Sequence, residues 1–240
     1  MPAPIESGAR AILPLTEASL ADAVEAVAAQ DRDLARVLAV YGCPPLWGRP
    51  SGFDTLVSII LEQQVSLASA RAAFGRLCEA GPVTPESFLR FSDGELLRIG
   101  FSRQKAGYCR GLARAVVSGD VDITALDRLD DDEVYPALMR LKGIGRWTAS
   151  IYLLMALGRP DVWPTGDIAL LQALQEVKGL PNRPTDEEAM RSAEAWRPWR
   201  AAAARLLWHW YLSSPRPRRK KQPTDRINVT GAILSSPRLT

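Results

Sequence analysis

The sequence predicts an all-α protein, and three of its features support this fold class. Alternating apolar and polar residues, the pattern of a half-buried strand, are nearly absent. Apolar stretches instead follow Ser, Thr or Asp residues that suit the position before a helix. The chain has 240 residues, 47% of them hydrophobic, so it can form one large domain or two small ones that share a cleft. Usual helix lengths predict about ten to twelve helices.

The capping residues place the expected helices in chain order. Proline fits the first turn of a helix, and acidic side chains near the start favour the positive end of the helix dipole. The expected helices are Leu67–Ala80 after Ser66, one beginning at Pro85 after Thr84, Arg103 to about Ser118 after Ser102, Asp131 or Asp132 to about Leu141, Ile168–Val177 after Asp167, one after Thr185 that runs to about Arg197, and Trp199–Ser213 beyond Pro198.

Two glycines, Gly143 and Gly145, lie in a short connection between a helix that ends near Leu141 and one that begins near Arg146. Glycine permits positive φ and removes Cβ from one side of the turn, so bare N–H groups at the new helix could bind a phosphate. Ile144 would point inward and fix the turn. On the turn alone, a tight helix–helix turn with a glycine cap is the favoured explanation, because such turns are common.

Asp167 stands alone before the apolar helix from Ile168. Asp is among the best helix-capping residues, which is the structural interpretation of this position. The functional interpretation is a catalytic carboxylate, kept ionised by the helix N-terminus. One side chain can do both.

The composition excludes several classes of protein. Cys43, Cys78 and Cys109 lie far apart and His209 is the only histidine, so neither zinc spacing nor a four-cysteine iron–sulfur cluster is present. A histidine-based triad has little room. No apolar run reaches the roughly 18 residues of a membrane span, and the first 25 residues do not resemble a signal peptide. We expect a soluble cytoplasmic protein.

Positive charge is concentrated at the C-terminus. Residues 214–240 carry seven Lys/Arg and one acid, a net charge of +6, so the rest of the chain carries −3 of the overall +3. The proline-broken, basic composition predicts a disordered tail. Such a tail either keeps the protein soluble or tethers it to phosphates, and the sequence leaves both open.

Four motifs together resemble the helix-hairpin-helix superfamily of DNA glycosylases, and within it the 3-methyladenine DNA glycosylase II group. In chain order they are ILEQQVSLASA from Ile60, GFSRQKAGYCRGLA from Gly100, LKGIGRWTA with VWPTGD from Leu141 to Asp167, and WRPWRAAAARLLW from Trp196. They cover roughly residues 53–211. The resemblance implies an all-α fold of two lobes, 52–158 and 1–51 with 159–213, with the active site in the cleft between them.

The resemblance also indicates the branch of the superfamily. Bifunctional members carry a Schiff-base lysine two residues after the second hairpin glycine, where this chain has Trp147. An aromatic side chain cannot be that nucleophile, so a monofunctional enzyme is expected. No iron–sulfur cluster, zinc or other cofactor is expected. Only about fifty residues precede the first motif, which is typical of the compact form without an N-terminal β domain.

The resemblance assigns roles in binding and excising a base. Asp167 would be catalytic, and Trp147, Trp208 and Trp163 would line the base pocket. Tryptophans also fill cores, which is the expected place of Trp196 and Trp199. Gln64 matches the wedge that fills the vacated base stack. A glutamine that caps the end of a helix is the alternative explanation of that position, and the wedge is preferred.

Further residues would contact the DNA backbone. Backbone N–H groups near Gly143, Gly145 and Thr148 are expected to bind a phosphate, and a sodium or potassium ion would bind the hairpin carbonyls of Met139, Leu141 and Ile144. Lys105 and Ser102 could also touch the backbone, although a solvated helix face explains them as well.

The sequence therefore predicts a monofunctional DNA-3-methyladenine glycosylase that acts at the bacterial nucleoid. Its partner would be double-stranded DNA with alkylated bases, and a monomer is expected. The lesion range stays open among 3-methyladenine, 7-methylguanine, ethenoadenine and hypoxanthine. Two alternatives also remain: a lesion-binding protein without catalysis, in which Asp167 is only a cap, and a bifunctional glycosylase/lyase that uses another amine.

Overall fold

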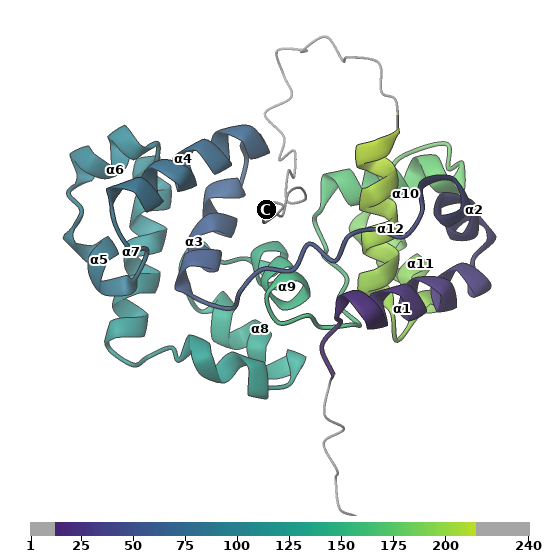
Figure 1. Ribbon diagram of the computed structural model, residues 1–240, viewed down its shortest axis with the longest axis horizontal. Helices are drawn as coiled ribbons and strands as arrows, with labels where there is room; N and C mark the ends of the chain where they lie inside the picture. Colours follow the sequence, from purple (N-terminus) through teal and green to yellow (C-terminus); the bar gives the residue numbers. More distant parts are fainter. Residues whose placement is uncertain (1–12, 215–240) are drawn as a thin grey trace, which may run out of the picture.

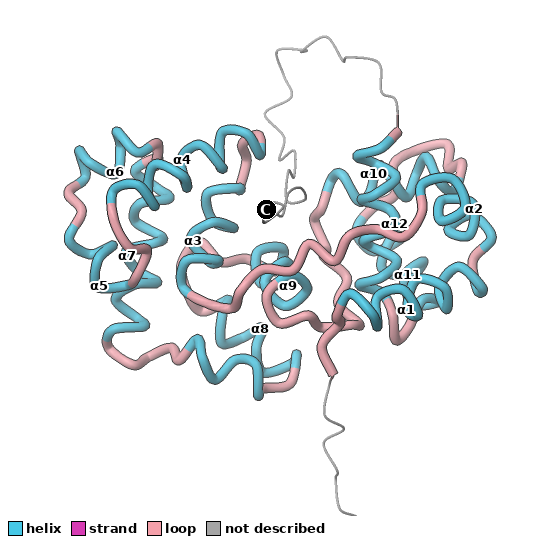
Figure 2. Tube along the Cα trace, viewed as in Figure 1, coloured by secondary structure: helices cyan, strands magenta, loops and turns pink. Residues whose placement is uncertain are grey.

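A computed structural model describes residues 13–214, and every regular element in that range is helical (Figures 1 and 2). The predicted all-α fold class is confirmed. The α-helices are α1 (Glu17–Gln30), α2 (Arg32–Tyr41), α3 (Phe53–Glu62), α4 (Leu67–Ala80), α5 (Pro85–Arg90), α6 (Asp93–Ile99), α7 (Arg103–Val117), α8 (Asp131–Met139), α9 (Arg146–Met155), α10 (Ile168–Lys178), α11 (Asp186–Ala193) and α12 (Arg200–Ser213). Two short 3-10 helices cover Ile123–Arg128 and Glu194–Trp196.

The helices gather into two groups (Figure 1). In one, α3 packs on α4 and α7, and α5 and α6 pack on α7; in the other, α12 packs on α1, α2 and α10. The first group lies at the left of Figure 1 and the second at the right, and α9 lies between them. The N-terminal helices thus pack with the C-terminal ones, as the expected lobes require. The lobe boundaries themselves stay a prediction.

The segment between α2 and α3 runs across the molecule from one group of helices to the other (Figure 2). Arg205, fully buried on α12, fixes this segment. Its guanidinium donates to the carbonyl oxygens of Leu46 at 2.9 Å, Leu154 at 2.8 Å and Ala201 at 3.1 Å. Burial lowers the pKa of Arg205 to about 9, so the side chain stays charged at neutral pH. Arg205 therefore ties the crossing segment to the end of α9.

Most predicted helix starts are confirmed. Ser66, Thr84, Ser102 and Thr185 each accept a hydrogen bond from a backbone N–H in the first turn of the following helix. The helix ends differ more. The helix from Asp131 stops two residues before the expected Leu141, since the chain there turns into the hairpin. The helix after Thr185 ends at Ala193, and a separate 3-10 turn follows it.

None of the described helices is both long and apolar enough to cross a bilayer. The basic tail expected from residue 214 lies outside the described residues apart from Ser214.

Candidate active site

Asp167 is the N-cap of α10 and is fully buried. Its Oδ1 accepts a hydrogen bond from the backbone N–H of Leu170 at 2.9 Å. The structural interpretation of this residue, a helix cap, is therefore confirmed. A cap needs only one carboxylate oxygen, so the environment of the second oxygen decides what else Asp167 can do.

The second oxygen of Asp167 faces aromatic side chains. Oδ2 accepts a hydrogen bond from the indole Nε1 of Trp147 at 3.2 Å. Trp208 is also buried, and its indole N–H has no partner at normal hydrogen-bond geometry, yet it lies close enough to lower the pKa of the carboxyl. Burial has the largest influence on the pKa of Asp167 and raises it to about 6. The N–H groups of Leu170, Trp147 and Trp208 act in the opposite direction and lower it. Asp167 is thus mostly ionised at neutral pH.

Trp163, the third tryptophan expected in the base pocket, packs against another buried tryptophan. Its ring packs against Trp196, with the ring centroids 5.5 Å apart and an interplanar angle of 45°. Both side chains are buried in the core. The structure thus brings Trp147 and Trp208 to Asp167, while the base-pocket role of Trp163 stays a prediction.

Asp186, which sequence reasoning missed, supports the loop that carries Asp167. Within this loop, Gly166 has φ +85 and directly precedes Asp167. Its backbone N–H donates to Oδ1 of Asp186, the first residue of α11, at 2.8 Å. In the sequence Asp186 is one of three acids in a first turn, and nothing distinguishes it from its neighbours.

The two hairpin glycines differ in what requires them. Gly143 has φ +93, and a Cβ there would lie 2.2 Å from the ring of Tyr108, so the fold excludes any side chain. Gly145 is the N-cap of α9 with φ −91, and a Cβ there would meet nothing within 4 Å. The helix also has no side-chain cap, so its N-terminus is open to an external partner. Ile144, between the glycines, points into the core as expected.

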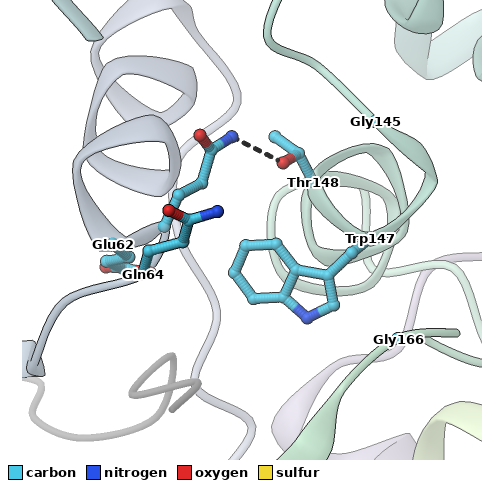
Figure 3. A pocket seen from close by; sticks show the side chains of 7 residues that line it. Glu62, Gln64, Gly145, Trp147, Thr148 and Gly166 are labelled. Atoms are coloured by element: carbon cyan, nitrogen blue, oxygen red, sulfur yellow. Dashed lines mark hydrogen bonds between the residues drawn. The ribbon is translucent and has the colours of Figure 1, made fainter. Parts of the chain in front are cut away.

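A cavity of about 200 Å³ lies between the end of α3 and the start of α9 (Figure 3). It is lined by Glu62, Gln63, Gln64, Gly145, Trp147, Thr148 and Gly166. Gln64 and Trp147 face each other across it (Figure 3). Trp147 is half-buried and covers Asp167, which does not itself line the cavity. The predicted wedge and one predicted base-pocket residue therefore share one opening in front of the carboxylate.

Three residues expected at the DNA phosphates have side chains with partners within the protein. The Lys105 ammonium donates to the carbonyls of Leu61 and Gln63, at 2.6 Å each. The Ser102 hydroxyl caps α7 through the backbone N–H of Lys105 at 3.2 Å. Thr148 is buried, and its hydroxyl accepts from Nε2 of Gln63 at 3.0 Å. The predicted DNA contacts of Lys105 and Ser102 stay predictions, and the interactions observed are internal.

Glu62 is a second carboxylate at the cavity that sequence reasoning overlooked. It is 5% exposed and pairs with Arg49 at 3.0 Å. Burial raises the pKa of Glu62, against the lowering effect of Arg49. A charged residue inside the apolar run before Gln63 was the available signal.

The hairpin carbonyls proposed for a monovalent cation come from Met139, Leu141 and Ile144. The carbonyl of Leu141 accepts the backbone N–H of Ile144 at 3.0 Å. Side-chain metal ligands do not cluster anywhere in residues 13–214. Carbonyl oxygens are a different type of ligand, so the cation site remains a prediction.

Residues 57–198 match the family model described as the HhH-GPD superfamily of base excision DNA repair proteins, where HhH stands for helix-hairpin-helix. The chain belongs to this superfamily. Its all-helical fold and the hairpin between α8 and α9 agree with that assignment. The predicted resemblance to its 3-methyladenine DNA glycosylase group is confirmed by the comparisons that follow.

Among curated proteins, DNA-3-methyladenine glycosylase 1 of Schizosaccharomyces pombe is 31% identical over 161 residues, which are 65% of this chain and 71% of that protein. The DNA-3-methyladenine glycosylase of Bacillus subtilis is 28% identical, over 67% of this chain and 57% of that protein. This chain thus matches only part of the length of these relatives.

Two solved structures show the same fold. The S. pombe 3-methyladenine DNA glycosylase in complex with abasic DNA superposes with a TM-score of 0.73 at 27% identity, covering 78% of this chain and 95% of that one. The DNA-3-methyladenine glycosidase of Bacillus halodurans superposes with a TM-score of 0.68 at 32% identity, covering 80% and 89%.

Proposed function

We propose that the chain is a monofunctional DNA-3-methyladenine glycosylase of base excision repair. It hydrolyses the N-glycosidic bond of alkylated purines, such as 3-methyladenine and 7-methylguanine, in double-stranded DNA. The observation that carries this proposal is the Asp167 carboxylate, which is buried behind the hairpin and held by the indole of Trp147. The names of the relatives support the class of substrate.

A single carboxylate suffices for this reaction. Cleavage of an N-glycosidic bond builds positive charge on the deoxyribose, as in glycoside hydrolysis. A purine alkylated at a ring nitrogen already carries positive charge, so it leaves without a strong general acid. An ionised Asp167 at about 4 Å from the sugar would stabilise that charge by about 4 kcal/mol at an effective dielectric of 20. That energy corresponds to roughly a thousandfold in rate. Asp167 can also orient the attacking water.

The target nucleotide must leave the base stack to reach Asp167. The carboxylate is fully covered in the free protein, so the Trp147 ring or the Gly166 loop has to move when the sugar enters. Trp147, which lines the cavity, provides a π face on which a cationic base can stack, and the buried Trp208 would provide a second face once this movement uncovers it. Gln64, exposed at the mouth of the cavity, fills the vacated position in the duplex.

The hairpin supports binding of the DNA backbone. The uncapped N-terminus of α9 presents N–H groups and the positive end of a helix dipole, both of which favour a phosphate. The open space at Gly145 lets a backbone approach closely. We expect the protein to bind as a monomer.

Trp147 supports a monofunctional mechanism, because an indole cannot form a Schiff base. The test combines two assays on double-stranded DNA with methylated purines. Chromatography should detect free 3-methyladenine and 7-methylguanine, and borohydride should trap no covalent adduct. A trapped adduct would identify a glycosylase/lyase. Tight binding to methylated DNA without any base release would identify a lesion-binding protein.

A further inference from the structure

Gln64 has an unusual backbone conformation for a residue with a side chain. Its φ is +58, and Trp47 is the only other non-glycine residue within residues 13–214 with positive φ. The left-handed region is disfavoured for residues with a Cβ and persists only where neighbours hold the chain. The question is which residues hold this turn, directly after α3.

Lys105 holds the turn from one side. Its ammonium reaches from the first turn of α7 to the carbonyls of Leu61 and Gln63, at 2.6 Å each. The last carbonyls of a helix lack partners within that helix, and a cation complements the negative end of the helix dipole. Lys105 thereby caps α3 at the residues that lead into Gln64.

Gln63 holds the turn from the other side. Its Nε2 donates to the carbonyl of Gly143 at 2.9 Å and to the hydroxyl of Thr148 at 3.0 Å. The second of these bonds is drawn in Figure 3. The residue before Gln64 is therefore bound to α7 through its carbonyl and to the hairpin through its side chain. Gln64 itself makes no side-chain hydrogen bond to the part of the chain that the structure describes.

We propose that Lys105 and Gln63 are positioning residues that hold Gln64 in place opposite Trp147 before DNA binds. This inference rests on the proposed glycosylase function and on the wedge role of Gln64. A turn fixed in advance does not have to be ordered when the base leaves the stack, so less binding energy is lost to ordering. It also fixes the wedge relative to the hairpin, which binds the DNA backbone.

The alternative role of Lys105 is a direct phosphate contact. The two roles differ in their dependence on salt. Loss of one phosphate contact weakens binding to any DNA and reduces the slope of log affinity against log salt by about 0.9. Loss of a positioning residue leaves binding to undamaged DNA unchanged and slows excision from the duplex.

The test uses the full chain and single-turnover release of methylated purines from duplex and single-stranded DNA. The variants are Lys105→Met, Gln63→Met, Gln64→Ala and the double variant Lys105→Met/Gln64→Ala. Arg114→Met is the matched control, because it removes a positive charge from the exposed side of the same helix. Each single variant at 63, 64 or 105 should slow duplex release about tenfold and single-strand release less than about twofold, since only the duplex needs a wedge.

The double variant separates the hypotheses. If Lys105 acts through Gln64, the double variant should be no more than about twofold slower than the slower single variant. The proposal would be overturned if the rate losses of the two single variants multiplied in the double variant. Equal losses on duplex and single-stranded DNA would overturn it as well. A reduced salt slope with undamaged DNA would assign Lys105 to a phosphate and would overturn it as well.

Hydrogen exchange gives a readout that does not depend on base release. Amides of residues 61–66 should exchange faster in Lys105→Met and Gln63→Met than in the wild type, while those of α12 should not change. Unchanged exchange in both variants would overturn the positioning role. If the wild type released no base but the exchange result held, the glycosylase function would fail and the anchoring of the turn would stand.

Discussion

The indole N–H of Trp147 donates to Oδ2 of Asp167 at 3.2 Å. Trp147 lies in the first turn of α9, and Asp167 is the N-cap of α10. The bond joins the helix that begins at the hairpin to the buried carboxylate. It also counteracts burial, which raises the pKa of Asp167 to about 6.

Activity should therefore depend on pH through Asp167. The carboxylate acts in its ionised form, so the single-turnover rate should fall as pH is lowered through about 6. Trp147→Phe keeps an aromatic ring but removes the donor, so the midpoint should move to higher pH. The measurement is the rate of base release between pH 5 and 8 for both proteins, with the enzyme in excess of the DNA and above the dissociation constant. An unchanged midpoint in Trp147→Phe would contradict the role given to this hydrogen bond.

The stability of the fold should depend on the same titration, but in the opposite direction: the rate rises with pH, whereas the free energy of unfolding falls. The pKa of Asp167 is about 6 in the folded protein, against an ordinary value of 3.8, so the folded state binds this proton more tightly than the unfolded chain does. This group therefore stabilises the fold at low pH, and that contribution is lost as pH rises to about 6. The difference corresponds to roughly 3 kcal/mol at neutral pH.

Asp167→Asn has no such titration, and Asn caps a helix about as well as Asp. Its free energy of unfolding minus that of the wild type should increase between about pH 4 and 6 and stay level above. Chemical denaturation across this range measures it. The prediction would be wrong if the difference decreased with rising pH.

The hairpin glycines should respond differently to alanine. Gly143→Ala places a Cβ on the Tyr108 ring and in a left-handed conformation, so it should destabilise the protein by about 2 kcal/mol or more. Gly145→Ala meets no neighbour and should leave the melting temperature nearly unchanged. This variant should nevertheless weaken binding to abasic DNA, because the added methyl group would lie where we expect the DNA backbone to approach. Equal melting temperatures for the two variants would refute this distinction.

Asp186 should matter for the rate through the peptide that precedes Asp167. Asp186→Ala removes the acceptor of the Gly166 N–H and should slow base release about tenfold, with little change in DNA affinity. Asp186→Asn keeps an acceptor oxygen and should restore most of the rate. Glu187→Ala is the matched control, because Glu187 is the next, exposed residue of the same first turn. The contact would have no role in catalysis if all three variants matched the wild type.

Local signals made much of the fold predictable. Ser66, Thr84, Ser102 and Thr185 cap helices as expected, because a cap depends on residues within one turn. Helix ends were less predictable, since they depend on where the chain must turn. The end of α8 at Met139 is an example.

The site was predictable where its residues belong to contiguous motifs. Trp147, Asp167 and Trp208 meet as expected. Contacts between distant segments had no local signal: the bond from Gly166 to Asp186, and those from Lys105 to the end of α3. The contact of Trp163 with Trp196 had no local signal either.

The central claim is that Asp167 is catalytic as well as a cap. The most direct test measures release of methylated purines from duplex DNA by the wild type and by Asp167→Asn, together with the thermal unfolding of both. We predict base release by the wild type and a loss of about a thousandfold in the single-turnover rate of a folded Asn variant, which is no less stable. Equal rates in the two proteins would contradict the claim and leave Asp167 only as the cap of α10.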